Sequence, residues 1–133
     1  MTPAFAVNRK LNNIKKGRAK VINASKDVLL ADRAKIADTY LERLTGLLNR
    51  KSLDKGEALI LLPSNCIHSF FMRFSIDVLF LDKNNKIIAA LPSFKPFRLS
   101  PVYFSASLVI ELPEFTIQST VSEVGDIIKI ASS

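Results

Sequence analysis

One histidine and two acids within apolar runs are the residues of this chain best suited to chemistry. His68 is the only histidine, and histidine is the side-chain type that changes charge nearest to neutral pH. Ser69 follows it directly, but neighbours in a strand point to opposite faces, which argues against a pair of nucleophile and base. An enzyme that uses His68 and Asp77 is one hypothesis, and it requires both side chains in one cleft.

Asp77 and Glu111 each stand among Ile, Val and Leu residues. An unpaired carboxylate is costly in such surroundings, so each must face solvent, accept several hydrogen bonds or pair with a cation. Arg43 and Arg73 are the predicted partners of Asp77, because a guanidinium can hold a carboxylate with two hydrogen bonds. Two interpretations follow: a structural network of ion pairs, or a polar pocket that holds a small ligand. The candidate binding residues are Arg43, His68, Arg73, Asp77 and Glu111.

Cysteine and histidine are too scarce for a structural zinc site, which uses four such ligands, whereas this chain has only Cys66 and His68. We therefore expect neither a metal nor another cofactor. A single cysteine also excludes an internal disulfide, and without this sign of an oxidising compartment we expect a cytoplasmic protein. Cys66 itself is expected to be a small, inert apolar residue.

The net charge of +7 comes from the beginning of the chain. Residues 1–26 contain seven Lys or Arg residues and no acid, and the remaining residues contain twelve charges of each sign. We expect residues 1–18 to form a basic, partly disordered arm and residues 19–133 a single domain. Such an arm can bind nucleic acid or an anionic membrane through counterion release and Coulomb attraction. Its candidate contacts are Arg9, Lys10, Lys15, Lys16, Arg18 and Lys20. No apolar stretch is long enough to span a membrane.

Hydrophobic patterning predicts six or seven strands and one or two short helices. Thr39 and Glu42 have the spacing of a capping box, so a helix is expected to begin here and to end near Gly46. A turn at Asp82–Lys86 requires a positive φ, which either asparagine of that turn can adopt. The predicted strands are Ala19–Asn23, Val28–Leu30, Arg33–Ile36, Glu57–Leu62, the run Ile67–Asp82 as one bent strand or two, Ile87–Leu91, Leu108–Leu112 and Ile127–Ala131, with an irregular loop at Pro92, Pro96 and Pro101 and a helical turn at Phe115–Ser119.

Together these elements predict an α+β domain with a mainly antiparallel sheet. Five runs in a fixed order are more specific: Arg43-x-x-Gly46-Leu47-Leu48-x-Arg50-x-x-Leu53, Gly56-Glu57-x-Leu59, IHSFFMRFSIDVLFLD, VIELP and VGDII. Over these runs the chain resembles the family catalogued as domain of unknown function 192. The resemblance implies a compact, β-barrel-like α+β fold and no established biochemical activity. Relatives often carry Gly where Phe115 stands, which predicts a different packing of that loop.

The first functional hypothesis is a small binding or accessory domain whose polar cluster holds a small molecule or a protein. The second is the enzyme that uses His68 and Asp77. The third is an adaptor that binds nucleic acid or an anionic membrane without specificity through its basic arm. The sequence names neither a ligand nor a reaction.

Overall fold

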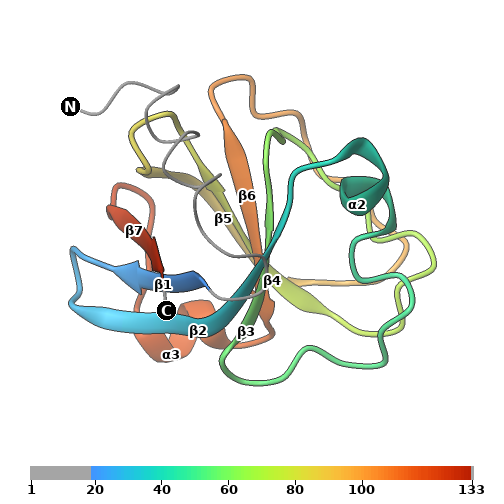
Figure 1. Ribbon diagram of the computed structural model, residues 1–133, viewed down its shortest axis with the longest axis horizontal. Helices are drawn as coiled ribbons and strands as arrows, with labels where there is room; N and C mark the ends of the chain where they lie inside the picture. Colours follow the sequence, from blue (N-terminus) through green and yellow to red (C-terminus); the bar gives the residue numbers. More distant parts are fainter. Residues whose placement is uncertain (1–18, 133) are drawn as a thin grey trace.

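In residues 19–132, which the computed structural model describes, one curled sheet of seven strands carries two short helices (Figure 1). The strand order in the sheet is β5-β4-β6-β3-β2-β1-β7. The predicted basic arm, residues 1–18, lies outside the described residues. In chain order the elements are β1 (Ala19–Asn23), β2 (Val28–Ala37), α2 (Tyr40–Thr45), β3 (Glu57–Leu61), β4 (Ile76–Leu81), β5 (Ile87–Phe94), β6 (Leu108–Pro113), α3 (Thr116–Thr120) and β7 (Ile128–Ser132).

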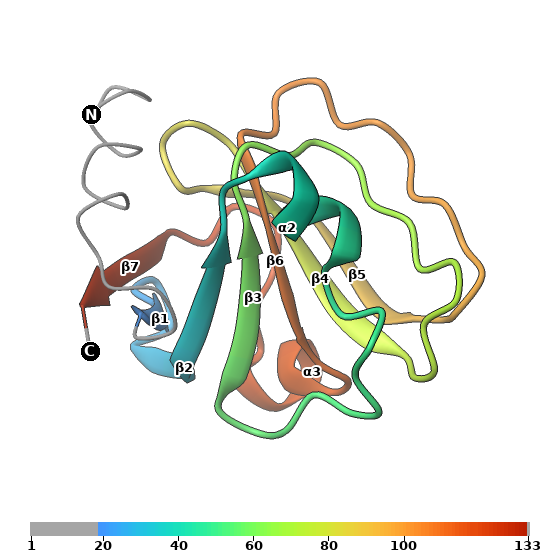
Figure 2. The same cartoon turned by 45° about the vertical axis from the view of Figure 1, so that its right-hand side comes forward.

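The sheet curls until its two outermost strands meet at one end (Figure 2). Adjacent strands pair antiparallel except β2 and β3, which are parallel. At the closing corner Lys86 and Ile127 form an isolated antiparallel bridge, and the amide of Ile128 donates to the carbonyl of Asn85 at 2.8 Å. The expected α+β fold with a barrel-like, mainly antiparallel sheet is confirmed.

Local signals placed the turns and caps correctly. The Thr39 hydroxyl accepts from the amide of Glu42 at 3.1 Å, which is the N-cap half of a capping box, and it donates to the Glu42 carboxylate at 2.9 Å. Gly46 ends α2 with φ at +44°, where a side chain would be strained. Asn85 takes φ of +61° in the β4–β5 turn, as an asparagine can.

The predicted strand or pair of strands over Ile67–Asp82 is wrong in its first half, because only β4 is a strand. The residues before it form a loop that lies over the sheet and makes one isolated bridge, from His68 to Leu99. Its apolar side chains serve as a cover, with Ile67 and Met72 buried against the sheet and Phe71 exposed. A cover needs apolar residues as a strand does, so composition could not separate the two.

Two further boundaries differ from the predictions. The separate segments Val28–Leu30 and Arg33–Ile36 belong to one continuous strand, β2. β5 continues through Pro92 to Phe94, where an irregular loop was expected. Because β5 ends the strand order, Pro92 can be placed there without removing a hydrogen bond that a central strand would need.

The sheet is apolar on both faces, and each face has its own core. The inner face, enclosed by the curl, buries Leu79 and Ile110 among others. The outer face buries Val78 and Val109 under α2 and the covering loops. Strands buried on both sides read as continuous apolar runs, which is why β4 and β6 carry almost no polar residue. No helix in residues 19–132 has the length and apolar character needed to cross a membrane.

Candidate functional site

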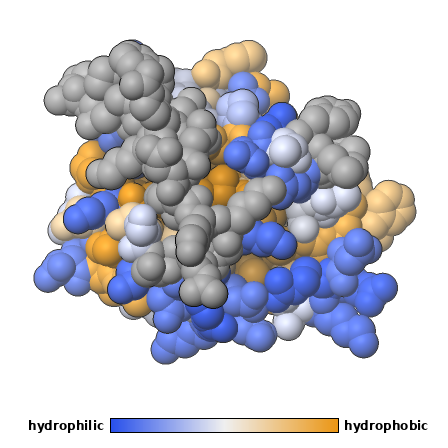
Figure 3. Space-filling model, viewed as in Figure 1, coloured by the Kyte–Doolittle hydropathy of each residue, from blue (hydrophilic) through white to orange (hydrophobic). Residues whose placement is uncertain are grey.

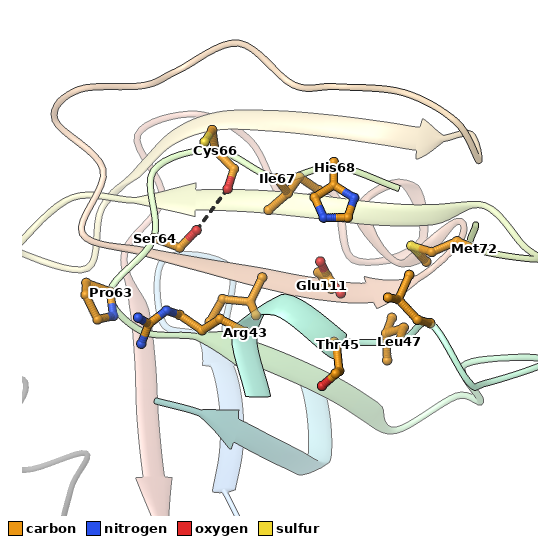
Figure 4. A pocket seen from close by; sticks show the side chains of 13 residues that line it. Arg43, Thr45, Leu47, Pro63, Ser64, Cys66, Ile67, His68, Met72 and Glu111 are labelled. Atoms are coloured by element: carbon orange, nitrogen blue, oxygen red, sulfur yellow. Dashed lines mark hydrogen bonds between the residues drawn. The ribbon is translucent and has the colours of Figure 1, made fainter. Parts of the chain in front are cut away.

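A cavity of about 390 Å³ lies on the outer face between α2, β6 and the loop that follows β3 (Figure 4). Its walls are mainly apolar, with polar groups at few positions. Three of the predicted site residues, Arg43, His68 and Glu111, line this cavity, whereas Asp77 and Arg73 do not. The apolar walls are formed by Leu47, Leu48, Leu61, Ile67 and Met72.

Glu111 is the buried acid of the cavity. It stands in the middle of β6, where its register partners are Leu59 on β3 and Val78 on β4, so its strand neighbours are apolar on both sides. The residue is 4% exposed, and its Oε2 accepts no hydrogen bond from the described residues. Burial raises the pKa of this carboxyl to about 8, because the ionised form loses its hydration there. At neutral pH the side chain is therefore mostly a neutral carboxylic acid.

His68 borders the same space from the covering loop (Figure 4). Its Nδ1 accepts from the amide of Phe70 at 3.3 Å, so the proton of the neutral imidazole is on Nε2. The Phe70 ring stacks on the imidazole, with 5.4 Å between centroids and 23° between planes. These two contacts and the bridge to Leu99 fix the orientation of the ring.

Arg43 projects from α2 and joins the helix to the end of β3. Its Nη1 donates to the carbonyl of Asp38 at 2.8 Å and to that of Leu62 at 3.2 Å. The predicted pairing of Arg43 with Asp77 is wrong, because these carbonyls take its place. Arg73 is exposed, and it too forms no ion pair with Asp77.

Asp77 is fully buried on the inner face of the sheet. Its Oδ1 accepts from the amide of Ser93 at 2.9 Å and its Oδ2 from the amide of Ile117 at 2.8 Å. The carboxylate thus links β4 to β5 and to α3. Register pairs Asp77 with Leu112 on β6, one position from Glu111, and successive side chains alternate between faces. Asp77 and His68 therefore lie on opposite sides of the sheet, and the single cleft that an enzyme using both would require is not formed.

Sequence reasoning missed part of the cavity wall. Ser64 and Cys66 line it from the covering loop, and the Ser64 hydroxyl donates to the Cys66 carbonyl at 3.0 Å. Cys66, expected to be a small and inert apolar residue, is half-buried at this wall. Pro63, which stops β3, is the only local signal that the chain leaves the sheet here. Periodicity cannot identify residues of an irregular loop that turn towards a cavity.

A second polar cluster joins the β1–β2 hairpin to the segment before β7. The Asn23 amide donates to Ser122 at 3.0 Å and to Asp126 at 2.9 Å, and the Lys26 ammonium donates to Asp126 at 3.1 Å. Burial raises the pKa of Asp126, but the hydrogen bonds from Asn23, the Glu123 amide and Lys26 outweigh it and lower that pKa. Each of these polar groups has a hydrogen-bond partner within the fold, so we interpret the cluster as a structural link between the hairpin and the segment before β7. No sequence pattern indicated it.

Comparison with known proteins places the chain in a family. The model of the DUF192 family, described as "Uncharacterized ACR", matches residues 21–130. A UPF0127 protein of Pyrococcus horikoshii is 33% identical over 114 residues, covering 82% of this chain and 96% of the relative. A UPF0127 protein of Pyrococcus abyssi is 37% identical over 112 residues, covering 80% of this chain and 92% of the relative. The chain therefore belongs to the DUF192 family, as the sequence motifs predicted.

Two crystal structures share the fold. A protein of unknown function from Novosphingobium aromaticivorans superposes with a TM-score of 0.73 at 19% identity, covering 84% of this chain and 82% of that one. A putative transcription regulator from Sinorhizobium meliloti superposes with a TM-score of 0.70 at 18% identity, covering 84% of this chain and 91% of that one. At these identities the likeness shows the fold alone. The relatives' names state no established activity.

Proposed function

We propose that this protein is a binding domain that holds a small, mainly apolar molecule in the cavity above Glu111. The observation that carries the proposal is the buried carboxyl of Glu111, which lines this cavity and whose Oε2 has no hydrogen-bond partner among the described residues. Unsatisfied buried polar atoms are rare in native proteins, and a ligand group can supply the missing partner. The volume of about 390 Å³ lies in the range typical of small-molecule sites.

The polar groups of the cavity favour an oxygen acceptor on the ligand. Glu111, with its pKa raised to about 8 by burial, is mostly protonated at neutral pH and can donate its O–H. His68 accepts through Nδ1 within its own loop, which leaves the Nε2–H as a second donor beside the cavity. A carbonyl or carboxylate group fits two such donors, and the apolar walls fit a hydrocarbon body.

Titration with three compounds of equal chain length tests this proposal. We expect 2-octanone and octanoate to perturb the NMR signals of Ile67, Met72 and Glu111, and octylamine to bind more weakly. Glu111→Leu should weaken the binding of both oxygen compounds at least about tenfold, the loss of one hydrogen bond to a buried donor. Glu111→Gln is the matched control, because its amide keeps a donor of similar shape. Stronger binding of octylamine, or no perturbation at the cavity by any compound, would contradict the proposal.

A cytoplasmic location is part of the proposal. Cys66 is a free thiol in the wall of the cavity, and a reducing compartment keeps such a thiol unmodified. Fractionation of cells that express the chain checks this location; recovery from an oxidising compartment would contradict it.

A further inference from the structure

Two loops run side by side over the outer face (Figure 2). Both carry exposed apolar side chains. One loop follows β3 and the other connects β5 to β6. We call Phe71, Phe97 and Leu99 the aromatic edge; they are 75%, 57% and 68% exposed. In the space-filling view of Figure 3, pale orange side chains project from the right-hand edge, where Figure 1 places the loop before β4. Large apolar side chains grouped at a surface mark an interaction site.

Buried hydrogen bonds hold the aromatic edge in place. Ser69 is buried between the loops, and its hydroxyl donates to the carbonyl of Lys95 at 2.6 Å and accepts from the amide of Arg98 at 2.9 Å. Its amide and carbonyl also bond across to the second loop, to Arg98 at 2.9 Å and to Phe97 at 3.0 Å. The exposed side chains are therefore carried on a fixed frame.

The backbone of the aromatic edge is strained. Phe71 has φ of +67° and Phe97 has φ of +61°, a region that bulky side chains rarely adopt. Their rings contact each other edge to face, with 5.8 Å between centroids and 73° between planes. Glycine would relieve the strain, yet both positions carry an exposed phenylalanine. The two exposed rings are thus held in contact with each other on a backbone that a bulky side chain rarely adopts.

The charged residues of the two loops have one sign. Residues 63–76 and 92–107, which contain both loops, include Arg73, Lys95 and Arg98 and no Asp or Glu. All three cations are exposed. The surface therefore combines apolar tips with cations, and its complement is a partner with an apolar interior and an anionic surface.

We propose that the aromatic edge docks on an anionic lipid membrane, with Phe71, Phe97 and Leu99 entering the interface and the three cations contacting lipid phosphates. Apolar side chains and nearby cations act together in this way on peripheral membrane proteins. Single-stranded nucleic acid fits less well, because bases stack on flat ring faces, whereas an edge-to-face pair and a leucine offer no stacked series. A second copy of the chain would bring cations against cations.

Vesicle binding by the full chain tests this proposal. We expect the protein to co-sediment with vesicles of phosphatidylcholine that contain about a third phosphatidylglycerol, and hardly with phosphatidylcholine alone. The double variant Phe71→Asn with Phe97→Asn should lower the partition coefficient at least about tenfold. Asn tolerates a positive φ, so the fold should be kept. Phe115→Asn is the matched control, since Phe115 is also exposed, at 60%, and has φ of +76° near α3.

A fluorescent variant gives a second measurement that does not depend on truncating the loops. The chain contains no tryptophan, so Phe97→Trp introduces a single reporter. Its emission should shift to shorter wavelength with anionic vesicles and be quenched by brominated lipid, while Phe115→Trp should show neither effect. Three results would overturn the proposal: no binding of the full chain to anionic vesicles, binding that both asparagine substitutions leave unchanged because the basic arm carries it, or a reporter that responds only to an oligonucleotide or an acidic protein.

Discussion

Two acids in neighbouring strands have opposite surroundings in this protein. Asp77 on β4 faces the inner core and accepts from two backbone amides, those of Ser93 and Ile117. Glu111 on β6 faces the outer cavity, where one of its oxygens has no partner among the described residues. The first acid is satisfied and the second is not.

The comparison shows that burial alone does not indicate function. Both residues are buried and both stand in an apolar strand, so neither the sequence nor the exposed fraction distinguishes them. The difference is in the groups opposite them: two amides for Asp77, a cavity for Glu111. A structural role is assigned to the acid whose partners are within the fold, and a binding role is proposed for the acid that lacks one.

The largest expected effect on stability comes from removing Asp77, the acid whose two oxygens both accept hydrogen bonds. Asp77→Ala leaves two buried amides without an acceptor and should lower the free energy of unfolding by roughly 3–5 kcal/mol. Chemical denaturation measures this loss. Arg43→Ala is the control, because the two side chains lie on different faces, and the losses in the double variant should simply add. A loss below about 1 kcal/mol for Asp77→Ala would contradict the buried role.

The next effect concerns Glu111 and depends on pH. Burial raises its pKa in the folded protein from the ordinary 4.5 to about 8, so between these values only the unfolded chain releases the proton. Stability from this group is full below pH 4.5 and is lost as pH rises through about 8. Glu111→Gln, which cannot ionise, should therefore be more stable than the parent by roughly 2–4 kcal/mol at high pH. At low pH the two should be equal.

Denaturation curves of the parent and of Glu111→Gln over this pH range provide the measurement. Glu57→Gln is the control for the substitution itself, because a partly exposed acid with a lowered pKa should not reproduce the gain at high pH. A stability difference that does not change with pH would show that Glu111 is hydrated in the folded protein and would remove the contrast with Asp77.

The smallest expected effect comes from Ser69, which joins the two loops that cover the outer face of the sheet. Ser69→Ala removes the hydroxyl that joins the two loops and should lower the free energy of unfolding by about 1–2 kcal/mol. It should also speed amide exchange at Phe97 and Arg98 while leaving the amides bonded to Asp77 protected. Exposed Ser105→Ala is the matched control. Equal acceleration on both faces would show that the inner and outer cores do not behave as separate regions.

The sequence by itself determined most of the local structure and the fold class. The helix start with its cap at Thr39, the asparagine turn before β5 and the strand β6 were all predicted correctly. Each depends on residues close together in the chain, whose hydrogen bonds and φ preferences act wherever the segment is placed. The family motifs added the barrel-like sheet. Sequence also identified Glu111 as a candidate, because a carboxylate among apolar residues requires an explanation. His68 was a candidate as the only histidine, and Arg43 as a possible partner of a buried acid.

Only the tertiary structure decided what each candidate contacts. The partners of Asp77 are backbone amides 16 and 40 positions away, and because nearly every residue supplies such an amide, no side-chain pattern marks them. The loop at Ile67–Ser75 has strand-like composition, and its place as a cover depends on the outer core beneath it. Because side chains alternate along β6, Glu111 points to the opposite face of the sheet from Ile110. This alternation does not show that a cavity lies on that face. That depends on how α2 and the covering loop pack, because a cavity is the space that distant segments leave unfilled.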